Sequence, residues 1–104
     1  MKPSLNRTIY VIYDDSITQE RVYMLGEVEF AHTRSFDENY DENYRRPLYY
    51  EEYNETWFTS LAKAKQRLLK DYKESFPDEQ VKIAQLYDDY WIIIGRYENI
   101  EDYR

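Results

Sequence analysis

The sequence contains no cysteine, only two glycines and only three prolines among 104 residues. The absence of cysteine excludes disulfide scaffolds, thiolate metal sites, iron–sulfur clusters and cysteine nucleophiles, and it favours a reducing compartment. No apolar run approaches the roughly 18 to 20 residues that a membrane-spanning helix needs. The opening residues, MKPSLNRT, also lack the apolar stretch of a signal peptide. These absences predict a soluble, cytoplasmic protein that does not enter a membrane.

The chain is instead rich in tyrosine and in acidic residues. It has thirteen tyrosines, two tryptophans and four phenylalanines, and its formal net charge is −7. Tyrosine combines apolar area with a polar tip, so it suits half-buried sheet faces and contact surfaces. An acidic balance argues against direct binding of nucleic acid, which requires Lys and Arg to neutralise phosphates. The composition therefore favours a basic partner, or simply solubility.

The first part of the chain predicts an antiparallel hairpin. Thr8–Tyr13 is apolar on both alternating faces, which is typical of a strand covered on both sides near the centre of a sheet. Arg21–Phe30 predicts a second strand, in which Gly26 marks a bulge or a close backbone approach. One face of this strand is expected to be apolar and to consist of Val22, Met24, Val28 and Phe30.

The clearest helix is predicted over Ser60–Phe76, with Thr59 or Ser60 as its cap and Pro77 as its end. Its apolar stripe consists of Leu61, Ala64, Leu68, Leu69, Tyr72 and Phe76. The remaining faces are net basic and include Lys63, Arg67 and Lys70. We interpret them as a solvated helix surface rather than as an anion-binding face.

Two further strands, Val81–Tyr87 and Tyr90–Tyr97, are expected to form a hairpin across Asp88–Asp89. Trp91–Ile94 is apolar on both faces, as Thr8–Tyr13 is. We therefore expect the strand over Tyr90–Tyr97 to lie beside the strand over Thr8–Tyr13 at the sheet centre. The acidic tail after Tyr97 is expected to fray.

These elements predict a single α+β domain over residues 1–104. The fold class is two-layer: a four- to five-stranded, mainly antiparallel sheet with one amphipathic helix on one face, in the order β-β-(β)-α-β-β. An acidic, tyrosine-rich excursion over residues 37–56 interrupts this order. The face that the helix leaves open must be aromatic and half-wet, or covered by a partner.

The excursion holds seven acids, two arginines and five tyrosines, and so supplies −5 of the net charge of −7. It begins with a tandem DENY repeat that resembles a calcium-binding loop, but Glu42 replaces the turn glycine and Leu48 replaces the bidentate glutamate. No metal site is therefore expected. Its second half, Leu48–Phe58, is either a strand that enters the core at Trp57 and Phe58, or mostly a loop.

His32 is the only histidine. Without a second histidine or a cysteine to join it, we interpret it as a surface polar residue near a strand end rather than as an acid–base group or metal ligand. The sequence also has no glycine-rich phosphate loop and no Cys–His pair. We therefore expect neither a catalytic residue nor a cofactor, and we do not expect an enzyme.

The run Trp57–Lys65, in which an extended segment ends in an aromatic residue and leads through Thr-Ser-Leu into a Lys/Ala-rich helix, supplies one resemblance. It is similar to small uncharacterised phage and bacterial α+β accessory proteins with a short sheet and one helix. The resemblance implies a phage-type accessory protein and carries over no catalytic residues. The long acidic excursion departs from that pattern.

Two functions are consistent with these features. The first is a non-enzymatic interaction protein, such as an inhibitor that mimics nucleic acid and occupies the basic site of a nucleic-acid-handling enzyme. The second is an assembly module that forms a homo-oligomer through an aromatic sheet face. A binder of single-stranded nucleic acid is disfavoured because no basic groove supports it. The predicted partner-binding residues are Asp37, Glu38, Tyr40, Asp41, Glu42, Tyr44, Tyr49, Tyr50, Glu51, Glu52, Tyr53 and Glu55.

Overall fold

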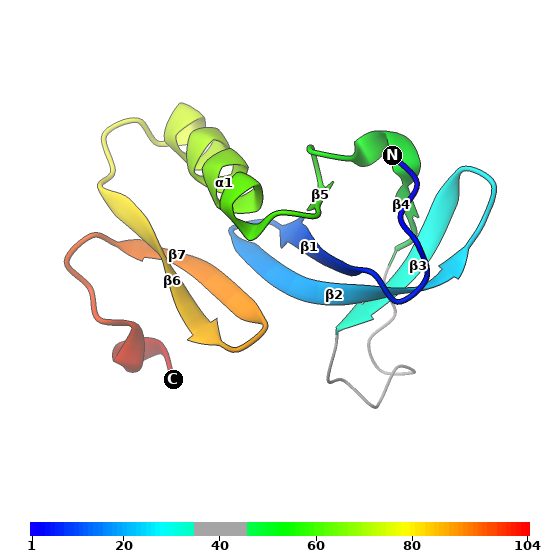
Figure 1. Ribbon diagram of the computed structural model, residues 1–104. Helices are drawn as coiled ribbons and strands as arrows, with labels where there is room; N and C mark the ends of the chain where they lie inside the picture. The colour runs from blue at the N-terminus through cyan, green and yellow to red at the C-terminus, as the bar shows by residue number, and fades with distance from the viewer. Residues whose placement is uncertain (35–45) are drawn as a thin grey trace.

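The computed structural model describes residues 1–34 and 46–104. The fold is α+β, with one α-helix packed against a curled antiparallel sheet (Figure 1). Two of the strands are only two residues long, and with them the sheet has seven strands. The elements are β1 (Thr8–Tyr13), β2 (Ser16–Leu25), β3 (Glu29–Arg34), β4 (Leu48–Tyr49), the 3-10 helix η2 (Tyr50–Glu52), β5 (Trp57–Phe58), α1 (Leu61–Ser75), β6 (Val81–Tyr87), β7 (Tyr90–Gly95) and the 3-10 helix η3 (Ile100–Tyr103).

The ten-residue strand β2 connects the two halves of the sheet. One of its edges pairs with β1 along the whole length of β1. Two strands pair with different parts of the other edge: β7 pairs with Ser16–Thr18, and β3 pairs with Glu20–Leu25. The sheet therefore forks along β2, with β3 and β4 on one branch and the β6–β7 hairpin on the other, as Figure 1 shows.

The helix α1 begins and ends close to the predicted positions. Ser60 is the N-cap, and its hydroxyl oxygen accepts a hydrogen bond from the Lys63 backbone N–H at 3.3 Å. Ala64 and Leu68 are buried, whereas Phe76 is the C-cap and is 47% exposed, so the apolar stripe ends before Phe76. The helix packs over β1, β2, β5 and β6. A hydrophobic core lies between the helix and the sheet, and its buried residues are Ile17, Phe58, Ala64, Leu68 and Trp91.

The opposite side of the sheet curls around a second core. It is aromatic, as expected, but the chain fills it with its own side chains. Phe30 contacts Trp57 edge to face at 5.0 Å between ring centroids and stacks on Tyr50 at 5.9 Å. Trp57 is fully buried, which confirms that the segment before the helix enters the core there. The buried residues of this cluster are Ile9, Val11, Val22, Phe30, Leu48 and Trp57.

The prediction of one strand over Arg21–Phe30 is wrong, because the chain turns between β2 and β3. Gly26 lies in this turn, where its N–H donates to the Glu29 carbonyl at 2.8 Å and an added Cβ would lie 3.0 Å from the same oxygen. The close backbone approach predicted at Gly26 is confirmed. The irregularity in strand pairing lies earlier, between Val22 and Met24. That register shift reverses the faces, so Leu25 packs on the core and Met24 is 61% exposed.

The C-terminal hairpin forms as predicted, but its position differs. β7 pairs with β2 rather than with β1, because β5 pairs with the other edge of β1 through Tyr10 and Val11. Both β1 and β7 are apolar on both faces, and this pattern alone does not determine which strand lies next to which.

The expectation that the tail frays is also wrong. The Tyr103 hydroxyl donates to the Glu98 carboxylate, and the Arg104 guanidinium donates to the Leu86 carbonyl at 3.0 Å. The bond from Tyr103, followed by the backbone N–H of Gly95, lowers the pKa of Glu98 below its usual value of 4.5. The same bond raises the pKa of Tyr103 above its usual value of 10.0.

We predict that replacing Leu68 by Ala lowers the free energy of unfolding by about 2–5 kcal/mol, because it leaves a cavity in the core under α1. The matched control is Leu69→Ala, which removes the same atoms from a neighbouring, half-buried position of the same helix. Urea denaturation of the two variants measures the difference. Equal losses would contradict the assignment of Leu68 to the core.

The Tyr103–Glu98 tether should depend on pH in two directions. The lowered pKa of Glu98 means that its contribution is present above pH 4.5 and is lost as pH falls through the folded value. The raised pKa of Tyr103 means that its contribution is present below pH 10.0 and is lost as pH rises through the folded value. The difference in absorbance between the wild type and Tyr103→Phe reports the ionisation of Tyr103 during a pH titration. Its midpoint should lie at a higher pH in the folded chain than in the urea-unfolded chain. Identical midpoints would refute the tether.

Candidate functional site

A buried polar network crosses the inner face of the sheet. The Glu20 carboxylate accepts from the Thr18 hydroxyl at 2.5 Å and contacts Nδ1 of His32 at 2.6 Å. The side chains of Glu20 and His32 are both fully buried. The pairing register explains this contact. Thr18, Glu20 and Val22 are two residues apart along β2 and so share its inner face, and His32 lies opposite Val22 on β3.

The other ring nitrogen of His32 contacts the backbone just before β4. Nε2 lies 3.0 Å from the carbonyl oxygen of Arg46. A carbonyl oxygen only accepts, so Nε2 carries a hydrogen and donates, and a second proton lies between Nδ1 and the Glu20 carboxylate. The interpretation of His32 as a surface residue is therefore wrong, and its ring joins β2, β3 and the residue before Pro47. A local sequence pattern offers little sign of this contact, because Glu20 and His32 are twelve residues apart.

A second ion pair closes the fork in the sheet. The Arg34 guanidinium donates two hydrogen bonds to Asp89, at 2.7 and 2.8 Å, and lies 5.5 Å from the centroid of the Tyr90 ring. Asp89 is 1% exposed, and its carbonyl oxygen accepts from Gln19 N–H at 2.8 Å. Such a bidentate pair has a fixed geometry. It therefore fixes the end of β3 against the start of β7.

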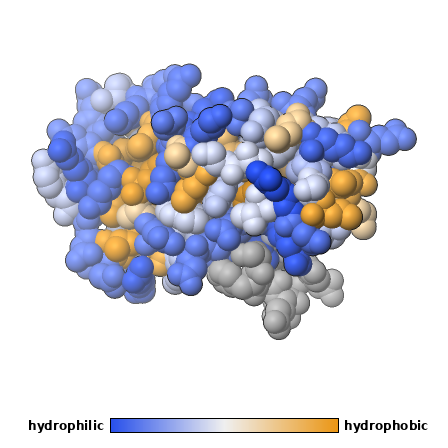
Figure 2. Space-filling model, in the orientation of Figure 1, coloured by the Kyte–Doolittle hydropathy of each residue, from blue (hydrophilic) through white to orange (hydrophobic). Residues whose placement is uncertain are grey.

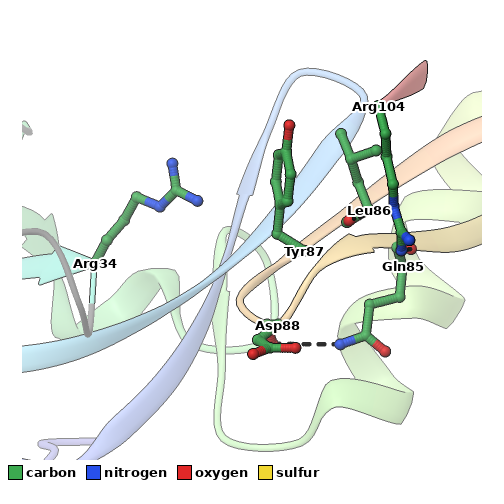
Figure 3. A pocket seen from close by; sticks show the side chains of 6 residues that line it. All are labelled: Arg34, Gln85, Leu86, Tyr87, Asp88 and Arg104. Atoms are coloured by element: carbon green, nitrogen blue, oxygen red, sulfur yellow. Dashed lines mark hydrogen bonds between the residues drawn. The ribbon is translucent and has the colours of Figure 1, made fainter. Parts of the chain in front are cut away.

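A pocket of about 730 Å³ is lined in part by Arg34 of this ion pair, and Figure 3 shows its lining residues. It is in the size range of small-molecule sites. Its two cations are already engaged, Arg34 by Asp89 and Arg104 by the carbonyls of Gln85 and Leu86. In the view of Figure 3, Arg34 stands apart from the other labelled residues, which come from the end of β6, the turn after it and the C-terminal residue. The lining residues are Arg34, Gln85, Leu86, Tyr87, Asp88 and Arg104.

Half of the predicted partner-binding residues lie outside the described part of the chain. These are Asp37, Glu38, Tyr40, Asp41, Glu42 and Tyr44. The other half surround the turn from β4 through η2 to β5. They are Tyr49, Tyr50, Glu51, Glu52, Tyr53 and Glu55.

Three of these six residues make contacts within the chain that hold the turn in place. The Tyr50 hydroxyl donates to the Gly26 carbonyl at 2.6 Å. The Glu52 carboxylate accepts from Tyr49 N–H at 2.8 Å and from Arg46 at 3.1 Å. The Tyr53 ring packs on Trp57, with 4.8 Å between the ring centroids.

The other three, Tyr49, Glu51 and Glu55, are exposed, and the fold adds neighbours that the sequence did not predict. Glu29 lies directly opposite Tyr49 in the β3–β4 pair. The carbonyl of Val28, a residue that is itself 60% exposed, accepts from Tyr50 N–H at 2.9 Å. We call this region the acidic–aromatic surface and define it as Met24, Glu27, Val28, Glu29, Tyr49, Glu51 and Glu55.

Figure 2 shows hydrophobic residues gathered at two places on one face of the molecule. The larger group lies between α1 and the β6–β7 hairpin, over the core under the helix. The smaller group lies toward the end where β2, β3 and β4 meet. The alternating pattern of the sequence places Met24 and Val28 on the same apolar strand face as Phe30. In the structure Met24 and Val28 are exposed, and for Met24 the cause is the register shift after Val22.

Comparison of the chain with protein-family models, curated proteins and solved structures found no match. Over residues 1–34 and 46–104, no three His, Cys, Asp or Glu side chains are grouped so that they could hold a metal ion. None of the helices in the same ranges is long and apolar enough to cross a membrane.

We predict that Glu20→Ala lowers the free energy of unfolding by about 3–5 kcal/mol, because it leaves the His32 ring in the core without its carboxylate partner. Glu27→Ala is the control, since this exposed glutamate lies in the turn after β2 and its loss should change stability by no more than about 0.5 kcal/mol. Thermal and urea unfolding of both variants measure the effect. A loss for Glu20→Ala as small as that for Glu27→Ala would show that the network stabilises nothing.

Proposed function

We propose that this protein is a non-catalytic interaction protein that binds a basic surface of another protein through the acidic–aromatic surface. The observation that carries the proposal is the exposure of three large side chains on the β2–β3 turn and the β4–β5 segment, which also carry four glutamates, one of them, Glu29, directly opposite Tyr49. Met24 is 61% exposed, Val28 60% and Tyr49 42%. The carboxylates are those of Glu27, Glu29, Glu51 and Glu55.

The two kinds of side chain support different parts of binding. Aromatic and other large apolar groups provide most of the affinity of protein interfaces when they are buried at the centre. Carboxylates at the rim attract a basic partner and raise the association rate more than they raise affinity. Tyr49 lies directly opposite Glu29 in the sheet, so an apolar anchor and a charge are adjacent on this surface.

The turn that presents Tyr49 is held from several directions before any partner binds. The indole Nε1–H of Trp57 donates to the Tyr49 carbonyl at 2.9 Å, and the Glu52 carboxylate accepts from the Tyr49 N–H. The preceding residue, Leu48, is buried in the core. A surface that is ordered in advance loses less conformational freedom on binding, which favours affinity.

The class of partner that fits best is an enzyme that handles nucleic acid. Such proteins arrange Lys and Arg to match the closely spaced phosphates of a duplex. A folded group of carboxylates competes for the same cations, and a net charge of −7 adds long-range attraction. The protein would then act as an inhibitor by occupying the nucleic-acid-binding site.

A homo-oligomer is the second candidate, favoured by the exposure of Met24 and Val28. Two copies that met through this region would also bring Glu27 and Glu29 of each copy together, and the like charges would repel. This candidate predicts self-association that increases with salt, whereas binding to a basic partner weakens with salt.

The test uses the full-length chain immobilised and exposed to a bacterial lysate. We expect a retained protein that 0.5 M NaCl releases and that a 20-base-pair DNA duplex displaces in competition. The variant Tyr49→Ala/Glu51→Lys/Glu55→Lys should retain at least tenfold less of it, because the variant loses one anchor and reverses two charges. Glu52 is left unchanged, because its carboxylate holds the turn.

The control carries matched charge reversals on the helix and the tail, Glu74→Lys/Glu101→Lys, at exposed positions outside the surface. It should bind as the wild type does. Equal losses for the two variants would mean that only net charge matters. Retention that neither salt nor duplex DNA reduces would overturn the proposed function.

A further inference from the structure

The outer edge of β6 is an open sheet edge. Strand β6 pairs with β7 along one side only, and the Arg96 N–H donates to the Gln80 carbonyl at 2.9 Å. In an antiparallel ladder, residues with inward hydrogen bonds alternate with residues whose N–H and C=O point away. The Gln80 carbonyl points toward β7. By this alternation, the backbone N–H and C=O groups of Val81, Ile83 and Gln85 point away from β7.

The 3-10 helix η3 lies against β6, and the side-chain hydrogen bonds that the chain makes to this edge are at its far end. Arg104 donates to the Gln85 and Leu86 carbonyls at 3.4 and 3.0 Å. Among the described residues, the outward backbone groups of Val81 and Ile83 have no hydrogen-bond partner. An open edge of this kind is a template for an added strand.

One hollow at the open half of the edge is basic in an acidic protein. A hollow of about 550 Å³ lies beside Val81, and the basic residues Lys73, Lys82 and Arg96 line it. Glu79 is the one acidic residue lining the hollow, and its carboxylate accepts a hydrogen bond from the Tyr72 hydroxyl at 2.7 Å. The local charge is thus opposite in sign to the net charge of −7.

We propose that the outer edge of β6 binds an extended, acidic segment of a partner protein, which adds to the sheet as a strand beside Val81–Ile83. The segment's backbone bonds the outward groups of Val81 and Ile83, and its acidic side chains pair with Lys73, Lys82 and Arg96. This site is separate from the acidic–aromatic surface, lies on the other branch of the sheet, and does not depend on the proposed function.

Charge also decides against a second copy of this chain as the occupant. An antiparallel pair of β6 edges would place Lys82 and Arg96 of one copy near the same residues of the other. Lysine on an edge strand discourages self-pairing in this way. The same side chains attract a strand of opposite charge.

The experiment uses the full-length protein and a fluorescein-labelled nonapeptide in which glutamate and valine alternate. Fluorescence anisotropy should show binding that weakens with salt, and hydrogen exchange should show new protection of the Val81 and Ile83 amides. A peptide in which lysine and valine alternate should not bind. Protection of these two amides distinguishes strand addition from mere attraction of negative charge.

Two variants separate backbone from charge. Val81→Pro removes one outward N–H at the first position of the strand, where proline is tolerated, and should abolish the amide protection. Lys82→Glu/Arg96→Glu should weaken binding by about tenfold or more. The matched control Lys63→Glu/Lys70→Glu makes the same charge change on α1 and should bind as the wild type does.

Three results would overturn the proposal. The first is unchanged affinity in Lys82→Glu/Arg96→Glu. The second is equal binding of a single-stranded ten-base oligonucleotide with no protection at Val81 and Ile83, which would show a general anionic site. The third is a concentration-dependent dimer in sedimentation that Val81→Pro abolishes, which would show that the occupant is a second copy.

Discussion

The contact between the Glu20 carboxylate and the His32 ring is the interaction on which the position of the segment from Arg46 to β5 depends. It places two ionisable groups inside the core, where each would be costly alone. One ring nitrogen faces Glu20 at 2.6 Å and the other faces the Arg46 carbonyl at 3.0 Å. The pair therefore joins β2 and β3 to Arg46, which lies shortly before β4 in the sequence.

The segment after Arg46 takes its position from this contact. Leu48 enters the core, Trp57 closes it, and the turn between them exposes Tyr49. On the β2–β3 hairpin, the register shift after Val22 exposes Met24, which lies opposite Ala31. An internal polar contact and a local irregularity of one strand thus create the surface on which the proposed function rests.

Much of the fold could be predicted from periodicity, and the failures have identifiable causes. The helix Leu61–Ser75 and the hairpin of β6 and β7 agree with the spacing, capping and turn position in the sequence. The faces of β2 could not be assigned beyond Val22, because alternation does not reveal a bulge. The position of β7 beside β2 and the burial of His32 depend on long-range pairing, which a local pattern does not contain.

The candidate site was predictable only in part, for the same reason. Composition identified Tyr49, Glu51 and Glu55, but it could not separate them from Tyr50, Glu52 and Tyr53, whose side chains hold the turn. It also missed Met24, Glu27, Val28 and Glu29, which reach the surface through strand pairing and the turn.

The central claim is that the Glu20–His32 contact holds the turn that carries Tyr49. The most direct measurement is hydrogen exchange in the double variant Glu20→Leu/His32→Leu, which removes the tie to Arg46 without leaving a charge unpaired in the core. We predict faster exchange at the Tyr49, Tyr50 and Asn54 amides, while α1 and the β6–β7 hairpin keep their protection. Unchanged exchange at these three amides would contradict the claim, because the turn would then hold its position without the buried pair.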